Sequence, residues 1–251
     1  MTAARLRPAA PKLVADALLA AGQAGPFFQL EAGNQACAAG WLSVAQLGQA
    51  GLASLTEDTA RQLGTAEARV AASILHAGLA ARLWSPVLAC GLLHGVVPDL
   101  SSLMIWTQPP VQLGVTSMTG WVATAPEQLA ELSAGVLGPQ LAALEMALPV
   151  PLAAGLLRGN SASAMAGALG VLVSANPALV EPAVELARAL LLTPALADAG
   201  VLADAGALAD AGALAATGLA LRRRSCCLYY RVPGGGLCGD CCFDSRPDTV
   251  S

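Results

Sequence analysis

Apolar residues recur at helical spacing along most of the chain. After Gly64 they return every three or four positions, at Val70, Ile74, Leu75, Leu79 and Leu83. This spacing places apolar side chains on one face of an α-helix. Ser85 followed by Pro86 is typical of an N-cap and the first helical position. The pattern therefore predicts one helix ending near Trp84 and a second one from Pro86 to about Gly95.

Start signals predict further helices downstream and upstream. Ser54 with Glu57 has the spacing of a capping box, in which the two side chains bond the first helical amides. Pro126, followed by acidic residues, indicates another helix start. The pairs 160–161 (Asn-Ser) and 176–177 (Asn-Pro) are expected to precede two more helices.

A different pattern lies between Leu103 and Trp121. The run Leu-Met-Ile-Trp, the break at Pro109-Pro110 and the run Val-Gln-Leu-Gly-Val predict a short β-hairpin. Residues 1–195 are therefore expected to form a mainly α domain with a minor β hairpin.

A six-residue repeat follows this domain. The unit Leu-Ala-Asp-Ala-Gly-Xaa starts at Leu196, Leu202 and Leu208, and a degraded copy starts at Leu214. Six residues of helix advance about 240° beyond a full turn, so the leucines form no single stripe. Each full unit supplies one Asp, without the ligand pattern of a calcium loop. We interpret residues 196–220 as a linker to a cysteine-rich segment at 221–251.

The composition bears on location and partners. Hydrophobic residues make up 55% of the 251 positions and charged residues 12%, with a mean hydropathy of +0.61. The apolar stretch 159–180 contains Asn160 and Asn176-Pro177, so it is expected to be a helix of the fold and no transmembrane span. The first residues lack the apolar core of a secretion signal, which predicts a cytoplasmic protein with reduced or metal-bound cysteines. Peripheral membrane association stays open. A net charge of −4 argues against nucleic acid as a partner.

Four cysteines near the C-terminus carry the strongest chemical signal. They have the spacing C-C-x10-C-x2-C in a segment rich in Gly and Pro: Cys226, Cys227, Cys238 and Cys241. Thiolates gathered in this way favour a soft metal centre, either zinc or iron–sulfur. Structural zinc sites use C-x2-4-C pairs, whereas a two-iron cluster accommodates adjacent cysteines whose side chains diverge. The spacing alone leaves both metals open.

The segment 223–241, Arg-Arg-Ser-Cys-Cys-Leu-Tyr-Tyr-Arg-Val-Pro-Gly-Gly-Gly-Leu-Cys-Gly-Asp-Cys, resembles the C-terminal signature of the FhuF-like ferric siderophore reductases. Residues 81–86 and 158–164 resemble motifs of that family's helical region. The resemblance implies a [2Fe-2S] cluster on Cys226, Cys227, Cys238 and Cys241. It also implies one-electron reduction of a ferric siderophore, from an electron donor that the sequence does not name. Cys242 directly follows the last ligand and departs from the family pattern.

Other functions remain as alternatives to this interpretation. An iron–sulfur electron carrier or redox sensor would need the cluster without a siderophore site, and a zinc-stapled binding module would need neither iron nor sulfide. Arg222, Arg223 and Arg224 are either a solvated charge run or a docking site for an anionic partner or substrate. No nucleophile triad or nucleotide loop is present in the sequence, and no acid–base catalytic residue is predicted. Cys37, Cys90, His76 and His94 are expected to be packing residues.

Overall fold

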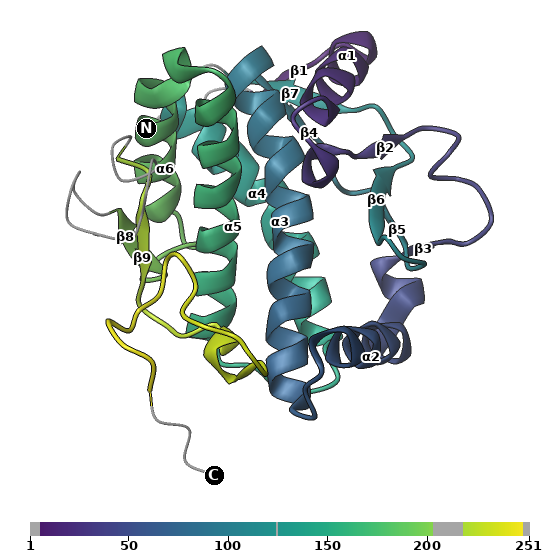
Figure 1. Cartoon of the computed structure of the whole chain (residues 1–251). Helices are drawn as coiled ribbons and strands as arrows, with labels where there is room; N and C mark the ends of the chain where they lie inside the picture. The colour runs from purple at the N-terminus through teal and green to yellow at the C-terminus, as the bar shows by residue number, and fades with distance from the viewer. Residues whose placement is uncertain (1–5, 124, 203–217, 248–251) are drawn as a thin grey trace.

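The structure is a computed structural model that describes residues 6–123, 125–202 and 218–247 (Figure 1). Its α-helices are α1 (Pro11–Gly22), α2 (Val44–Leu63), α3 (Ala68–His94), α4 (Pro126–Met146), α5 (Ala154–Ala175) and α6 (Val180–Leu191). Three short 3-10 helices accompany them: η1 (Pro26–Phe28), η2 (Pro177–Leu179) and η3 (Tyr229–Arg231). The predicted mainly α architecture is confirmed.

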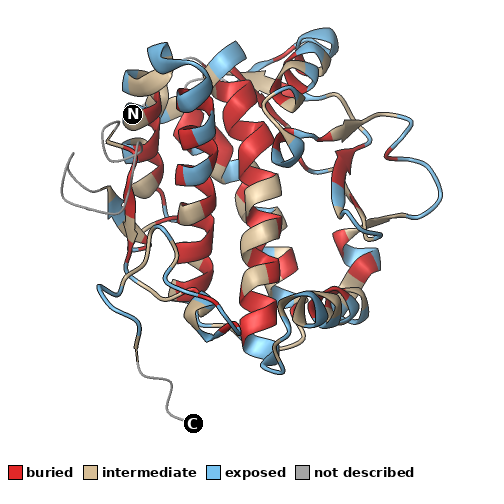
Figure 2. Cartoon of the chain, in the orientation of Figure 1, coloured by how far each residue is buried: buried red, intermediate tan, exposed pale blue. Residues whose placement is uncertain are grey.

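Helices α3 and α5 run side by side through the centre of the protein (Figure 1). Their contact is the main helix pairing, and both are largely buried along their length (Figure 2). Fully buried side chains such as Trp84, Met165 and Leu169 form the core between the helices. Both helices are long and apolar enough to cross a membrane, but 72% of each apolar window is buried inside the protein. Helices that are apolar all round are expected at such a central position.

Small sheets cover one side of the helices (Figure 1). Strands β1 (Arg7–Pro8), β7 (Gly120–Val122) and β4 (Val96–Pro98) form one sheet, in that order. A second sheet has the order β2 (Glu31–Ala32), β6 (Gln112–Val115), β5 (Leu103–Trp106) and β3 (Trp41–Ser43). The predicted hairpin is confirmed as β5 and β6, which pair antiparallel with Leu103 opposite Val115. The flanking strands are only two or three residues long, too short to show an alternating pattern in the sequence.

Three predicted helix starts are wrong. The capping box lies at Ser43, whose hydroxyl accepts from the Gln46 N–H at 3.2 Å, so Ser54 lies within α2. Pro86 lies inside the continuous helix α3, and Asn160 lies inside α5. Proline inside a helix costs about 3 kcal/mol. Burial of the neighbouring side chains, including Trp84 at 0% exposure, outweighs this local preference.

The predicted linker joins the fold at both of its ends. Leu196 and Ala199 are buried, and β8 (Gly200–Leu202) pairs antiparallel with β9 (Leu221–Arg223). The first repeat unit and residues 218–220 therefore belong to the packed structure. The rest of the repeat, residues 203–217, lies outside the described residues.

Candidate metal centre

The cysteine-rich segment packs against the N-terminal halves of α3 and α5 (yellow in Figure 1). The Ser73 hydroxyl on α3 donates to the carbonyl oxygen of Cys227 at 2.7 Å. The Ser225 hydroxyl donates to the carbonyl oxygen of Gly155, at the start of α5, at 2.6 Å. Arg231 forms an ion pair with Glu67, the N-cap residue of α3, at 2.8 Å. Both helix ends that face the segment carry the positive end of a helix dipole, which favours anionic groups.

Tight turns bring the two halves of the cysteine motif together. Leu228, directly after the first two cysteines, has a positive φ of 70°, and Gly234 has a φ of 73°. The Gly235 N–H donates to the Val232 carbonyl at 2.8 Å and closes the turn before Cys238. Only a residue without a Cβ fits at Gly235, because a Cβ there would meet the Tyr229 carbonyl oxygen at 2.6 Å.

Two of the sulfurs are in direct contact. The Sγ atoms of Cys227 and Cys238 lie 3.5 Å apart. Electrostatic interactions link Cys226 to both Cys227 and Cys241, and they link Cys242 to Cys226 and Cys241. Two sulfurs on one tetrahedral metal, each about 2.3 Å from it, lie about 3.8 Å apart. The Cys227–Cys238 separation therefore fits two ligands of a single metal ion.

Among residues 6–123, 125–202 and 218–247, no three His, Cys, Asp or Glu side chains surround one common metal position. A single zinc ion needs four ligands that converge on one point. A two-iron cluster needs two pairs of sulfurs, one pair for each iron. The contact between Cys227 and Cys238 supplies one such pair of sulfurs, and Cys226 and Cys241 are the candidates for the second pair.

Backbone amides point at the sulfurs. The Leu228 N–H donates to Cys226 Sγ at 3.2 Å, and the Phe243 N–H donates to Cys241 Sγ at 3.5 Å. The Tyr229 N–H similarly stabilises the sulfur of Cys227. Hydrogen bonds of this kind stabilise anionic sulfur, and they tune the potential of iron–sulfur centres.

The protonation preferences of the thiols follow from these contacts. The hydrogen bond shared by Cys227 and Cys238 lowers the pKa of Cys227 to about 6 and raises the pKa of Cys238. Burial raises the pKa of Cys226, and it raises the pKa of Cys242 to about 11. The shared hydrogen bond thus favours one thiolate within the Cys227–Cys238 pair, and the thiolate is the form that binds metals.

The three arginines of the predicted docking site have different environments. Arg223 is 4% exposed and lies inside the protein, so the docking prediction is wrong for this residue. The cause is its hydrogen bond to Asn160 on α5, which draws the guanidinium inward. Arg222 and Arg224 reach the surface, where they form ion pairs with Asp244 at 2.6 Å and Asp198 at 2.8 Å. These carboxylates offset the positive charge expected for binding an anion.

The remaining candidates occupy varied positions. Cys90 is buried as predicted, and burial raises its pKa to about 12. Cys37 is exposed, contrary to the prediction, because it lies in the turn before β3. His76 is 1% exposed and lies 3.3 Å from Glu145 and 3.4 Å from Asn160, as expected for a hydrogen-bonded packing residue. His94 lies exposed at the end of α3 and is not a packing residue.

Ser73 and Asn160 contact the cysteine-rich segment, and sequence patterns did not predict these contacts. Both are fully buried polar residues on the central apolar helices, at 0% exposure. A polar side chain within such a helix is a usable signal, because burial requires a hydrogen-bond partner. The sequence does not reveal that the partners lie in the cysteine segment.

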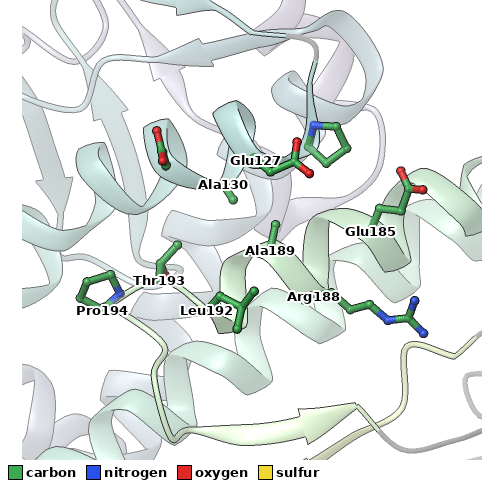
Figure 3. Close-up of a pocket in the computed structure, with 10 residues that line it drawn as sticks. Glu127, Ala130, Glu185, Arg188, Ala189, Leu192, Thr193 and Pro194 are labelled. Atoms are coloured by element: carbon green, nitrogen blue, oxygen red, sulfur yellow. The ribbon is translucent and has the colours of Figure 1, made fainter. Parts of the chain in front are cut away.

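A cavity of about 630 Å³ lies between α4 and α6 (Figure 3). Its lining includes the charged side chains of Glu127, Glu185 and Arg188, together with Leu192 and Thr193. None of the lining residues is a cysteine, so this cavity is separate from the cysteine motif.

The fold and the site define a mainly helical protein with a cysteine-rich C-terminal segment suited to a metal centre. Residues 223–243 match the family model of the FhuF 2Fe-2S C-terminal domain. The predicted resemblance is thereby confirmed for the cysteine segment. No curated protein and no solved structure matches the chain.

Proposed function

We propose that this protein is a ferric siderophore reductase whose redox centre is a [2Fe-2S] cluster held by Cys226, Cys227, Cys238 and Cys241. The observation that carries the proposal is the match of residues 223–243 to the FhuF 2Fe-2S C-terminal domain. The contact between the Cys227 and Cys238 sulfurs supports it, because two thiolate ligands of one metal lie at about this separation.

The residues around the cysteines have defined tasks in this proposal. A bound [2Fe-2S] cluster supplies reversible transfer of one electron. Leu228 and Phe243 direct their N–H groups at ligand sulfurs, and Ser73 fixes the backbone at Cys227. Helices α3 and α5 hold the segment through the hydrogen bonds of Ser73 to Cys227 and of Ser225 to Gly155. No general acid, base or nucleophile is needed for transfer of an electron.

The substrate in this proposal is iron(III) bound by a siderophore. Siderophores hold Fe(III) through hard oxygen donors, and one electron converts the metal to the softer Fe(II). The weaker binding of Fe(II) lets the metal pass to other ligands in the cell. We place this reaction in the cytoplasm, where thiols stay reduced. All seven cysteines are free of disulfide bonds in the structure.

Metal and sulfide analysis of anaerobically purified protein tests the cofactor. Two irons and two sulfides per chain are expected, with the visible absorption of an iron–sulfur protein. Stoichiometric zinc without sulfide would instead establish the zinc-stapled binding module.

Electron transfer tests the activity. The dithionite-reduced protein should reduce a ferric hydroxamate, and a ferrous chelator should trap the product as it forms. The Cys226→Ser protein, prepared in the same way, provides the control. If ferric hydroxamates, catecholates and citrate reoxidise the reduced protein no faster than buffer does, the electron carrier or redox sensor is the correct function.

A further inference from the structure

Arg223 is a buried cation without an acidic partner among the described residues. Its side chain is 4% exposed, and its Nη2 donates to Asn160 Oδ1 at 2.7 Å and to the Leu156 carbonyl at 3.3 Å. Both acceptors are neutral. In the part of the chain that the structure describes, Arg223 forms no ion pair with a carboxylate, and its Nε has no hydrogen-bond partner. Removing a guanidinium from water costs several kcal/mol unless an anion lies nearby.

Arg223 lies beside both halves of the cysteine motif. It stands three residues before Cys226, and its backbone N–H donates to the carbonyl oxygen of Asp240, between Cys238 and Cys241, at 3.0 Å. Its guanidinium and the Ser225 hydroxyl, one residue before Cys226, meet at the same point of α5 beside Gly159. A positive charge at this place favours a negatively charged centre. At the protein surface, water and salt would screen the effect of a guanidinium on a nearby negative charge. Arg223 is instead buried against the first turns of α5. Its charge acts there in a less polar medium, where charges interact more strongly.

A chain of buried polar groups fixes the position of Arg223. The Asn160 amide nitrogen donates to the Ser73 carbonyl oxygen at 2.9 Å and lies 3.4 Å from His76 Nδ1, which turns the amide oxygen toward Arg223. His76 is held in turn by Glu145 at 3.3 Å. Gly159 leaves the space for the guanidinium, because a Cβ there would meet Arg223 Nη2 at 2.7 Å. The helical core thus holds one positive charge at a fixed place beside the cysteines.

A negative charge opposes it from the other half of the motif. Asp240 lies between Cys238 and Cys241, and its Oδ2 is buried without a hydrogen-bond partner among the described residues. Its carboxylate thus lies in the loop that carries two of the proposed ligands, where a negative charge disfavours further negative charge on the centre.

We propose that Arg223 is a positioning residue that sets the reduction potential of the metal centre by holding a buried positive charge beside it, while Asp240 acts in the opposite direction. This inference rests on the proposed [2Fe-2S] cluster. The cluster with its four thiolates becomes more negative by one charge on reduction. A fixed cation therefore stabilises the reduced form and raises the potential, and a fixed anion lowers it.

The test is an anaerobic redox titration of the full-length holoprotein, followed by electron paramagnetic resonance of the reduced cluster. The variants are Arg223→Gln, Arg223→Lys and Asp240→Asn. Arg224→Gln is the matched control. It also removes one positive charge, one position further along the chain, but the Arg224 side chain is exposed and paired with Asp198. In Arg223→Gln the equilibrium constant for reduction should fall about tenfold or more, and tenfold corresponds to about 59 mV for one electron. Asp240→Asn should shift the potential upward, and Arg223→Lys and Arg224→Gln should stay close to wild type.

Equal potentials in Arg223→Gln and Arg224→Gln would overturn the inference. If Arg223→Gln fails to bind iron, Arg223→Lys decides the matter. A Lys variant with a normal cluster and potential supports the requirement for a buried charge. Loss of the cluster from both variants would assign Arg223 a purely structural role and overturn the proposal. Wild-type iron and sulfide are measured first, so absence of a cluster is distinguished from failure of this inference, and siderophore reduction enters none of the measurements.

Discussion

The Ser73 hydroxyl donates a hydrogen bond to the carbonyl oxygen of Cys227 at 2.7 Å, joining residues 154 positions apart in sequence. Ser73 lies within α3 and is completely buried. The bond satisfies a backbone acceptor at the first cysteine pair, and Asn160 bonds the Ser73 carbonyl from α5. The central helix pair thereby determines where the cysteine segment lies.

Replacing Ser73 with Ala should lower the stability of the protein. The Cys227 carbonyl would lose its buried donor, and an unsatisfied buried group costs about 1–3 kcal/mol. A chain of this size loses about 2–4 °C of melting temperature per kcal/mol. Thermal unfolding followed by circular dichroism measures the shift. Ser174→Ala is the control, since the Ser174 hydroxyl donates to the Gly170 carbonyl of its own helix. Equal melting temperatures for the two variants would show that the Ser73–Cys227 bond contributes little.

Two glycines on α5 provide a matched pair of substitutions. A Cβ at Gly159 would meet Ser225 Oγ at 2.5 Å and Arg223 Nη2 at 2.7 Å, whereas a Cβ at Gly167 would meet nothing within 4 Å. Gly167→Ala should therefore stabilise the helix by about 0.5–1 kcal/mol. Gly159→Ala should destabilise the protein by about 1–3 kcal/mol, because the added methyl group displaces the buried arginine.

Chemical denaturation of both glycine variants measures the difference in stability. Limited proteolysis of Gly159→Ala should also show earlier cleavage in residues 218–247, since Arg223 and Ser225 hold this segment to α5. Matching stabilities for the two variants would contradict the close packing at Gly159.

The sequence allowed the chemistry of the site to be predicted more completely than its surroundings. The cysteine spacing is local, so the four candidate ligands could be read directly from residues 226–241. Burial of Arg223 depends on Asn160, which is 63 positions away, and no local pattern distinguishes Arg223 from its exposed neighbours. A run of three arginines is typical of a solvated surface, and the contact with α5 overrides that expectation for one of them.

The fold shows the same division between local and long-range information. The start of α4 and the hairpin of β5 with β6 agree with local signals at Pro126 and around Pro109. Pro86 gives an equally strong local signal, yet α3 continues through it because its neighbours are buried on all sides. The paired strands β8 and β9 were missed since their residues belong to a repeat without strand periodicity and to an arginine run.

Cysteine substitutions should separate ligands from bystanders. Serine at position 226, 227, 238 or 241 should each remove most of the iron and sulfide, because each iron needs a complete set of ligands. Cys37→Ser is the control and should keep the cluster, since Cys37 is exposed and outside the segment. Iron and sulfide assays of anaerobically purified variants provide the measurement. Full iron content in any of the four would exclude that cysteine as a required ligand.

Cys242 requires its own comparison because it interacts electrostatically with Cys226 and Cys241. Cys242→Ser alone should retain the cluster. If Cys241→Ser also retains the cluster, the double variant Cys241→Ser with Cys242→Ser is needed. Loss of the cluster in the double variant would mean that Cys242 replaces Cys241 as a ligand, and retention would mean that the cluster needs neither cysteine. The expected result is loss of the cluster in Cys241→Ser itself.

Buried and exposed thiols should differ in their reaction with iodoacetamide. Burial raises the pKa of Cys90 to about 12, so at pH 8 about one molecule in ten thousand carries the reactive thiolate there. Cys37 is exposed and should be modified readily in the native protein. Mass spectrometry of peptides before and after unfolding in urea measures both sites. Modification of Cys90 in the native state at the rate of Cys37 would contradict its burial in the core.

Shortening the repeat should have little effect on stability. Strands β8 and β9 pair on either side of residues 203–217, with Leu202 opposite Leu221, so deleting residues 208–213 removes one repeat unit and leaves the strand pair intact. The cost of closing a loop varies slowly with its length, by about 0.6 kcal/mol for each doubling. The melting temperature and the visible spectrum of the deletion variant should therefore match those of the wild type. Leu196→Ala gives the contrast: Leu196 is fully buried at the start of the repeat, so truncating its side chain should lower the melting temperature clearly. A large loss of stability or of the cluster from the deletion would mean that the repeat contributes to the fold beyond connecting the two strands.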